Sequence, residues 1–167
     1  NKELFAETGI EGLPETWDEL VDVAQKLTDP AKRRWGYFMY DHIFGWQAMM
    51  VQRGGEFLSK DKTEPLFVSP VGIEMLQWMV DNIHSRKISP TMDILGGSFT
   101  NALAKPEILQ GRAAMWGSHN GMTPTYERDG IVDFGIGIWP GYNGNHTAVE
   151  MSAANIIFKE SKHPDMA

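Results

Sequence analysis

The chain has 167 residues, of which 42% are hydrophobic and 22% are charged, values typical of one ordinary globular domain. Its 15 basic and 22 acidic residues give a formal net charge of -7, which argues against binding the phosphate backbone of a nucleic acid. The absence of cysteine excludes disulfides, thiolate metal sites and a cysteine nucleophile. No apolar run in the sequence approaches the roughly 18 residues that a membrane-spanning helix needs.

The first forty residues predict two helices and a strand. Residues 1–8 are expected to end a helix at Gly9, because glycine is common just after a helix. The next helix is expected to begin at Thr16, which forms a Thr-x-x-Glu capping box with Glu19. Its apolar residues recur at helical spacing and predict one buried face: Trp17, Leu20, Ala24 and Leu27. Residues 36–40 predict a strand.

The middle of the chain predicts two further helices. Residues 43–53 form an apolar helical segment that ends at the glycine pair 54–55. Ser69 is the expected cap of the next helix, with Pro70 at its first position and its end near Lys87. A stripe at helical spacing is expected to be its buried face: Ile73, Leu76, Val80 and Ile83.

The last third mixes helical and strand patterns. Residues 98–110 predict an interrupted helix, and 113–117 and 132–139 predict strands. Residues 148–157 form another apolar stretch. Residues 161–165 are typical of a helix beginning, with a serine cap and a proline in the first turn. A helix that begins at the final residues predicts that this sequence is a piece of a longer protein. The alternation of strands and helices favours an α/β fold.

Several short motifs occur in a fixed order along the chain: PETWDEL (14–20), a tryptophan followed by a glycine pair (46–55), FVSP (67–70), LQGRAAM (109–115), FGIG (134–137) and SKHP (161–164). Together they resemble the motifs of family 1 extracellular solute-binding proteins of the maltodextrin-binding type. The resemblance covers nearly the whole chain. It implies an α/β lobe of the type II periplasmic-binding-protein kind, with a mixed sheet flanked by helices. Residues 1–167 would form the C-terminal lobe of a two-lobed protein, with the first lobe absent from this chain.

The resemblance also implies a function. Proteins of this family capture a solute for an ABC importer, here a sugar or oligosaccharide held in the cleft between two lobes, without chemistry and without a cofactor. The implied partners are the sugar-like ligand and the importer's permease in the membrane, and the implied state is a monomer. The implied location is extracytoplasmic, either in the periplasm or lipid-anchored on the outer face of the cytoplasmic membrane.

A sugar site needs aromatic rings beside hydrogen-bonding side chains, and the first segment with this mixture contains Asp41, His42 and Trp46. It lies where a predicted strand ends and a predicted helix begins, the edge at which open α/β sheets bind ligands. The alternative interpretation is that Asp41 caps the helix and Trp46 belongs to the core.

Two later segments offer the same mixture. Trp116, His119 and Asn120 follow the strand predicted at 113–117, and the resemblance implies that this loop lines the binding site. An Asn-Gly turn beside a packed tryptophan is the alternative. Trp139 begins a glycine- and asparagine-rich loop, and Glu150 lies in an otherwise apolar run. A buried unpaired charge is costly, so Glu150 either points to solvent or faces the cleft.

Two competing functions remain open from the sequence. A metal-dependent hydrolase could use a spatial cluster of Asp41, His42, His119 and Glu150, although the histidines show no H-x-x-x-H spacing. An interaction domain without a small ligand is the second alternative. We expect no catalytic residue and no bound metal.

Overall fold

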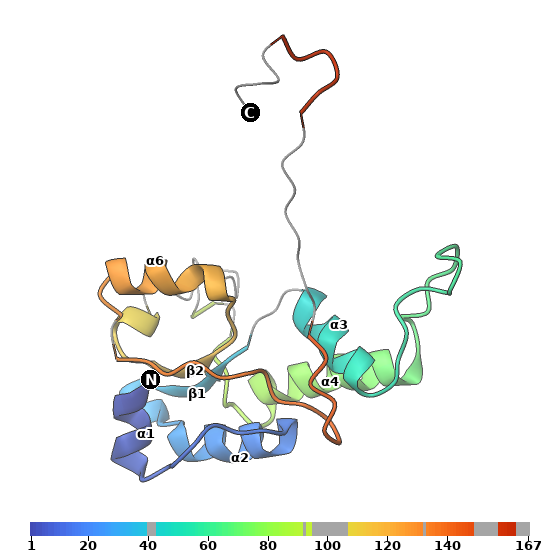
Figure 1. The fold of residues 1–167 in the computed structure, drawn as a ribbon. Coiled ribbons are helices and arrows are strands. Elements are labelled where there is room, and N and C mark those ends of the chain that lie inside the picture. Colours follow the sequence, from blue (N-terminus) through green and yellow to red (C-terminus); the bar gives the residue numbers. More distant parts are fainter. Residues whose placement is uncertain (40–42, 92, 95–106, 132, 149–156, 163–167) are drawn as a thin grey trace.

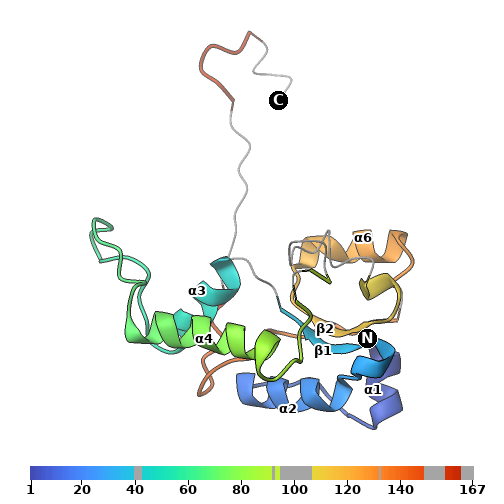
Figure 2. The ribbon, with the colours of Figure 1, turned by 180° about the vertical axis from the view of Figure 1, so that it is seen from behind.

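The computed structural model describes residues 1–39, 43–91, 93–94, 107–131, 133–148 and 157–162. In chain order its elements are α1 (Lys2–Thr8), α2 (Trp17–Leu27), the 3-10 turn η1 (Pro30–Lys32), β1 (Trp35–Phe38), α3 (Ile43–Gln52), α4 (Pro70–His84), β2 (Ala113–Trp116), the 3-10 turn η2 (Asn120–Met122) and α6 (Thr123–Arg128). Helices α1 and α2 lie on one side of the two strands and α6 lies on the other (Figure 1). Helices α3 and α4 lie beside the strands, at the end away from α1, in both views (Figure 1 and Figure 2).

The strands β1 and β2 form a parallel pair in the register Trp35–Ala113, Tyr37–Met115 and Phe38–Trp116. The strands predicted at 36–40 and 113–117 are therefore confirmed, with small shifts of their bounds. The strand predicted at 132–139 is wrong for its described residues, which have no neighbouring strand in the described part of the chain.

Backbone hydrogen bonds hold the two ends of that last segment. The Lys2 amide donates to the Asp133 carbonyl at 3.1 Å, and the Gly141 amide donates to the Glu15 carbonyl at 2.8 Å. The segment from residue 133 to 141 therefore runs beside α1 and the connection from α1 to α2. Between these two anchors its residues belong to no strand in the described part of the chain.

Helix α2 begins and packs as its sequence predicts. The Thr16 hydroxyl accepts from the Glu19 amide at 3.2 Å, and the Glu19 carboxylate accepts from the Thr16 amide at 3.2 Å. Its predicted apolar face is buried. Strand β1 approaches the helix so closely that a Cβ atom at Gly36 would overlap the Ala24 carbonyl oxygen. Glycine at position 36 is what allows this contact.

The buried face predicted for α4 is wrong. Ile73, Leu76 and Val80 are 60%, 48% and 47% exposed, and of the predicted stripe Ile83 alone packs against the core. The helix instead buries another set of residues: Gly72, Met75 and Asn82, with Val71, Trp78 and Met79 beside them. It also ends at His84, three residues before the expected position.

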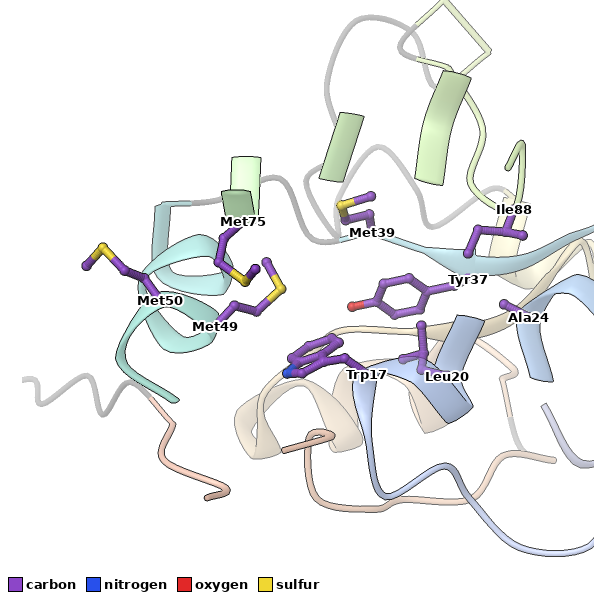
Figure 3. Packing of buried hydrophobic residues seen from close by; sticks show 9 residues of the cluster. All are labelled: Trp17, Leu20, Ala24, Tyr37, Met39, Met49, Met50, Met75 and Ile88. Carbon is purple, nitrogen blue, oxygen red and sulfur yellow. The ribbon is translucent and has the colours of Figure 1, made fainter. Parts of the chain in front are cut away.

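The physical reason is that α4 is apolar on more than one side, so spacing alone does not select the face. Trp46 of α3 packs against α4 at Gly72, where its indole N–H donates to the Gly72 carbonyl at 2.8 Å. This contact turns the side that carries Gly72 and Met75 toward α3. The resulting core joins α2, β1, α3 and α4 and is rich in methionine, as Figure 3 shows. No helix in the described residues is both long and apolar enough to cross a bilayer.

Candidate functional site

A pocket of about 1220 Å³ opens beside the end of β2. Three parts of the chain supply most of its lining: α1 with its connection to α2, residues 114–119 at the end of β2, and the segment 134–140. The other described lining residues are Leu20, Tyr37, Phe44, Thr123, Tyr126 and Ala148. Pockets for drug-sized molecules measure roughly 300–1,000 Å³, so this hollow has room for more than one sugar-sized ring.

Three aromatic rings form one wall of the pocket, and we call them the rim cluster: Trp116, Tyr126 and Phe134. The Trp116 ring lies 5.9 Å from that of Tyr126 and 6.3 Å from that of Phe134, measured between centroids, and the Tyr126 and Phe134 rings lie 6.0 Å apart. The Tyr126 hydroxyl lies 3.0 Å from the Ser118 hydroxyl. Trp116 is only partly buried, so part of its side chain is exposed at the pocket wall.

A second group of rings, the inner cluster, consists of Trp17, Trp78 and Trp139. The Trp17 ring makes edge-to-face contacts with Trp78 at 5.4 Å and with Trp139 at 5.9 Å. Trp139 also lines the pocket, so it belongs both to the packed interior and to the pocket wall. Trp17 does not line the pocket and is 9% exposed.

Tyr37 is a buried member of the pocket lining. Burial raises the pKa of its hydroxyl well above the ordinary tyrosine value, and a hydrogen bond with the Trp139 side chain offsets part of that rise. The hydroxyl is therefore protonated at neutral pH. Its oxygen accepts the hydrogen bond from the Trp139 side chain, and its O–H remains a potential donor at the pocket lining.

The pocket brings together some of the residues predicted from the sequence. Trp116, His119 and Trp139 all line it, and the His119 side chain is exposed. Asn120 is the first residue of η2, but its side chain is not described. That these residues bind a ligand stays a prediction.

Of the other predicted site residues, Trp46 alone is described by the structure. Trp46 is absent from the pocket lining and packs edge-to-face against Phe57 and Phe67 in the α3–α4 region. Asp41, His42 and Glu150 lie outside the described residues. The predicted hydrolase cluster depends on these three residues; within the described ranges, no three His, Asp or Glu side chains are placed to hold a metal ion.

Sequence reasoning missed Tyr37, Tyr126 and Phe134 as pocket residues. Tyr37 lies in a short buried strand, where a tyrosine is usual core material. Phe134 belongs to the FGIG motif, whose resemblance pointed only to a strand. The signal that could have found Tyr126 is its position in the short helix that follows the Trp116–Asn120 loop.

Comparison with known proteins identifies the class to which this fold and pocket belong. Residues 1–167 match the profile of a family described as bacterial extracellular solute-binding protein. The chain therefore belongs to the bacterial extracellular solute-binding protein family.

Solved structures of similar fold agree with this assignment. An ABC substrate-binding protein from Listeria monocytogenes in complex with cycloalternan is 24% identical, with a TM-score of 0.77, over 87% of this chain and 37% of that one. A solute-binding protein from Thermotoga lettingae bound with α-D-tagatose is 25% identical, with a TM-score of 0.74, over 89% of this chain and 38% of that one. The cyclic α-maltosyl-1,6-maltose binding protein from Arthrobacter globiformis is 28% identical, with a TM-score of 0.68, over 87% and 37%.

These likenesses confirm the predicted fold class, an α/β fold of the periplasmic-binding-protein kind. The chain spans 37% to 38% of the length of these three proteins.

Proposed function

We propose that this chain is part of an extracytoplasmic binding protein that captures a sugar or oligosaccharide for an ABC importer and performs no chemistry. The observation that carries the proposal is the pocket wall, where the rim cluster and Trp139 lie beside the hydrogen-bonding side chains of Ser118 and His119. The similar proteins are in complex with, or are described as binding, sugars, which supports the same ligand class.

The lining suits a neutral, hydroxyl-rich ligand. Aromatic rings offer flat apolar surface to the C–H face of a sugar, while hydroxyl, imidazole and indole N–H groups bond its hydroxyls. Lys2 and Glu11 are the charged side chains among the described lining residues, and Lys2 lies 3.7 Å from the Asp133 carboxylate. Neither sign of charge dominates the pocket, which favours a neutral ligand over an anion or a cation.

The proposed cycle needs a second lobe. Residues 1–167 would supply one wall of a cleft, and closure of two lobes about a hinge would bury the sugar. The closed form would then dock on a membrane permease. We propose a monomer without a cofactor, located in the periplasm or anchored by lipid outside the cytoplasmic membrane.

A thermal-shift screen of the complete gene product tests the proposal. The ligands are compounds bound in solved structures of similar fold, namely maltotriose, cycloalternan, D-tagatose and ribitol. Each is titrated over several decades of concentration. A ligand that binds only the folded state stabilises it by about 2.7 kcal/mol at a hundred times its dissociation constant. We expect at least one of these neutral compounds to raise the Tm in this way. If none of these compounds raises the Tm, or if metal analysis finds stoichiometric zinc, sugar capture is contradicted.

A pair of tryptophan variants tests the site. Trp116→Ala removes a ring from the pocket wall, and we expect it to weaken the sugar identified in the screen about tenfold or more, roughly 1.4 kcal/mol. Trp46→Ala is the matched control, because Trp46 is absent from the pocket lining. It should lower the Tm but leave the dissociation constant unchanged. Equal losses of affinity in both variants would show that this pocket is not the binding site.

A further inference from the structure

A buried glutamine, Gln52, joins three separate parts of the chain. It is the last residue of α3 and is 4% exposed. Its side-chain oxygen accepts the Trp17 indole N–H at 2.6 Å. Its side-chain nitrogen donates to the Pro140 carbonyl at 3.2 Å and to the Thr147 carbonyl at 2.9 Å. Gln52 thereby ties helix α2 to both ends of the loop that follows Trp139.

That loop is a tight hairpin with its own internal order. Tyr142 and Asn145 exchange backbone hydrogen bonds at 3.1 and 2.9 Å, across a two-residue turn. The turn residues Asn143 and Gly144 have φ values of 49° and 77°, the left-handed conformation that an Asn-Gly hairpin turn requires. The Asn145 side chain donates to the Gln52 main-chain carbonyl at 3.1 Å, which adds a further link to α3.

The chemistry of the three side-chain bonds requires an amide. Glutamine has one oxygen acceptor and two N–H donors on the same planar group, so it can accept from an indole and donate to two carbonyls at once. Glutamate would keep the acceptor but lose both donors, and leucine would lose all three bonds. Because the site is buried, each group left without a partner carries the full cost of its lost hydration.

We propose that Gln52 is a positioning residue for the pocket. It does not line the pocket, but it fixes the residue next to Trp139 and the far end of the hairpin, and so sets where the Trp139 ring stands on the pocket wall. The link to ligand binding rests on the proposed function, whereas the link to the Trp139 position does not.

The test uses the complete gene product labelled with 5-fluorotryptophan, whose ¹⁹F resonances are assigned with Trp17→Phe and Trp139→Phe. In Gln52→Leu, both the Trp17 and the Trp139 resonances should shift or broaden. In Gln52→Glu, which keeps the acceptor for the Trp17 indole, the Trp139 resonance should move more than that of Trp17. The glutamate variant also keeps the test informative if the leucine variant fails to fold.

Asn82→Leu is the matched control. Asn82 of α4 is also a fully buried amide; its side-chain oxygen accepts from the Arg86 guanidinium, just beyond the end of the helix, at 2.9 Å, and it has no described hydrogen bond to the hairpin. This variant should lower the Tm while the Trp139 resonance stays in place. A Trp139 resonance that is unchanged in both Gln52 variants, or that moves equally in Asn82→Leu, would overturn the positioning role.

A second measurement separates this inference from the proposed function. Maltotriose affinity is measured by calorimetry well below the Tm of each protein. We expect at least a fivefold weaker affinity in both Gln52 variants and an unchanged affinity in Asn82→Leu. If the wild-type protein does not bind maltotriose, the affinity arm is repeated with cycloalternan and D-tagatose. Failure of all three sugars counts against sugar capture, and the ¹⁹F result still decides the role of Gln52. If the Trp139 resonance shifts in the Gln52 variants while their affinity for a sugar that binds the wild type stays unchanged, the proposed link between Gln52 and ligand binding is overturned.

Discussion

The inner cluster and the rim cluster are both built mainly from edge-to-face ring contacts, with one tilted pair in the rim cluster, but the rest of the chain supports them differently. In the inner cluster, a buried glutamine accepts the Trp17 indole N–H, and the ring is almost fully covered. In the rim cluster, Trp116 is only half-buried, and Phe134 lies in a segment without a sheet partner among the described residues.

This difference separates stabilising aromatics from aromatics that are free to bind. A ring that is covered on all sides, such as that of Trp17, contributes packing and presents no face to a ligand. A ring that stays partly exposed at the pocket wall, such as that of Trp116, can exchange contact with water for contact with a sugar. Trp139 belongs to the inner cluster and also lines the pocket, so its position matters for the proposed site.

The largest expected effect is the loss of the inner ring. Trp17→Ala should lower the free energy of unfolding by about 3–5 kcal/mol, because it opens a cavity and leaves the Gln52 oxygen unpaired. Urea unfolding followed by far-UV circular dichroism measures this loss. Trp116→Ala should cost clearly less, about 1–2 kcal/mol, since its ring is partly exposed. Equal losses in the two variants would remove the distinction between the clusters.

Two glycines compare the tightly packed contact between α2 and β1 with the open lining of the pocket. Gly36→Ala should destabilise by about 3 kcal/mol, because its new methyl group would overlap the backbone of α2 at Ala24. Gly135→Ala is the control on the pocket side, where nothing lies within 4 Å of the added atom. It should change the free energy of unfolding by less than about 0.5 kcal/mol. A tolerated Gly36→Ala would contradict the close packing of α2 on β1.

The buried Tyr37 hydroxyl, which is hydrogen-bonded to Trp139 of the inner cluster, predicts a pH dependence. Its pKa is raised in the folded state, so the folded protein holds this proton more tightly than the unfolded chain does. The contribution of this proton to the free energy of unfolding is therefore fully present below about pH 10, the pKa of tyrosine in the unfolded chain. Above that pH it is lost at up to about 1.4 kcal/mol per pH unit. Unfolding measured from pH 8 to 11 should show this decline, and Tyr37→Phe should reduce its slope. An identical slope in the variant would place the alkaline sensitivity elsewhere.

The smallest expected effect concerns the N-terminal caps of two helices, α2 and α6, which lie on opposite sides of the sheet (Figure 1). Thr16→Ala should cost about 1 kcal/mol, because it removes the hydroxyl of the capping box that starts α2. Met122 occupies the same position before α6 but makes no side-chain cap bond. Met122→Ala should therefore change stability by less than about 0.5 kcal/mol. Thermal unfolding of the two variants compares them directly, and a larger loss at Met122 would contradict the comparison.

Local features of this chain could be predicted from its sequence. The capping box at Thr16, the start of α4 at Ser69, and both strands of the sheet were predictable, because a cap or a buried strand is specified by residues a few positions apart. The ordered motifs also predicted the family, which the match over residues 1–167 shows.

Contacts between distant residues could not be read in that way. Whether Ile73 or Met75 faces the core depended on where α3 packs, and this required Trp46 to meet Gly72. The Gln52 bonds to Pro140 and Thr147 join positions 88 and 95 residues apart.

Spacing along the chain therefore specifies which residues can share a helix face or a strand, because those relations arise within a few residues. It does not specify which of two apolar faces is covered, or which rings meet at a pocket. Those outcomes depend on the free energy of packing elements that approach one another only when the chain has folded.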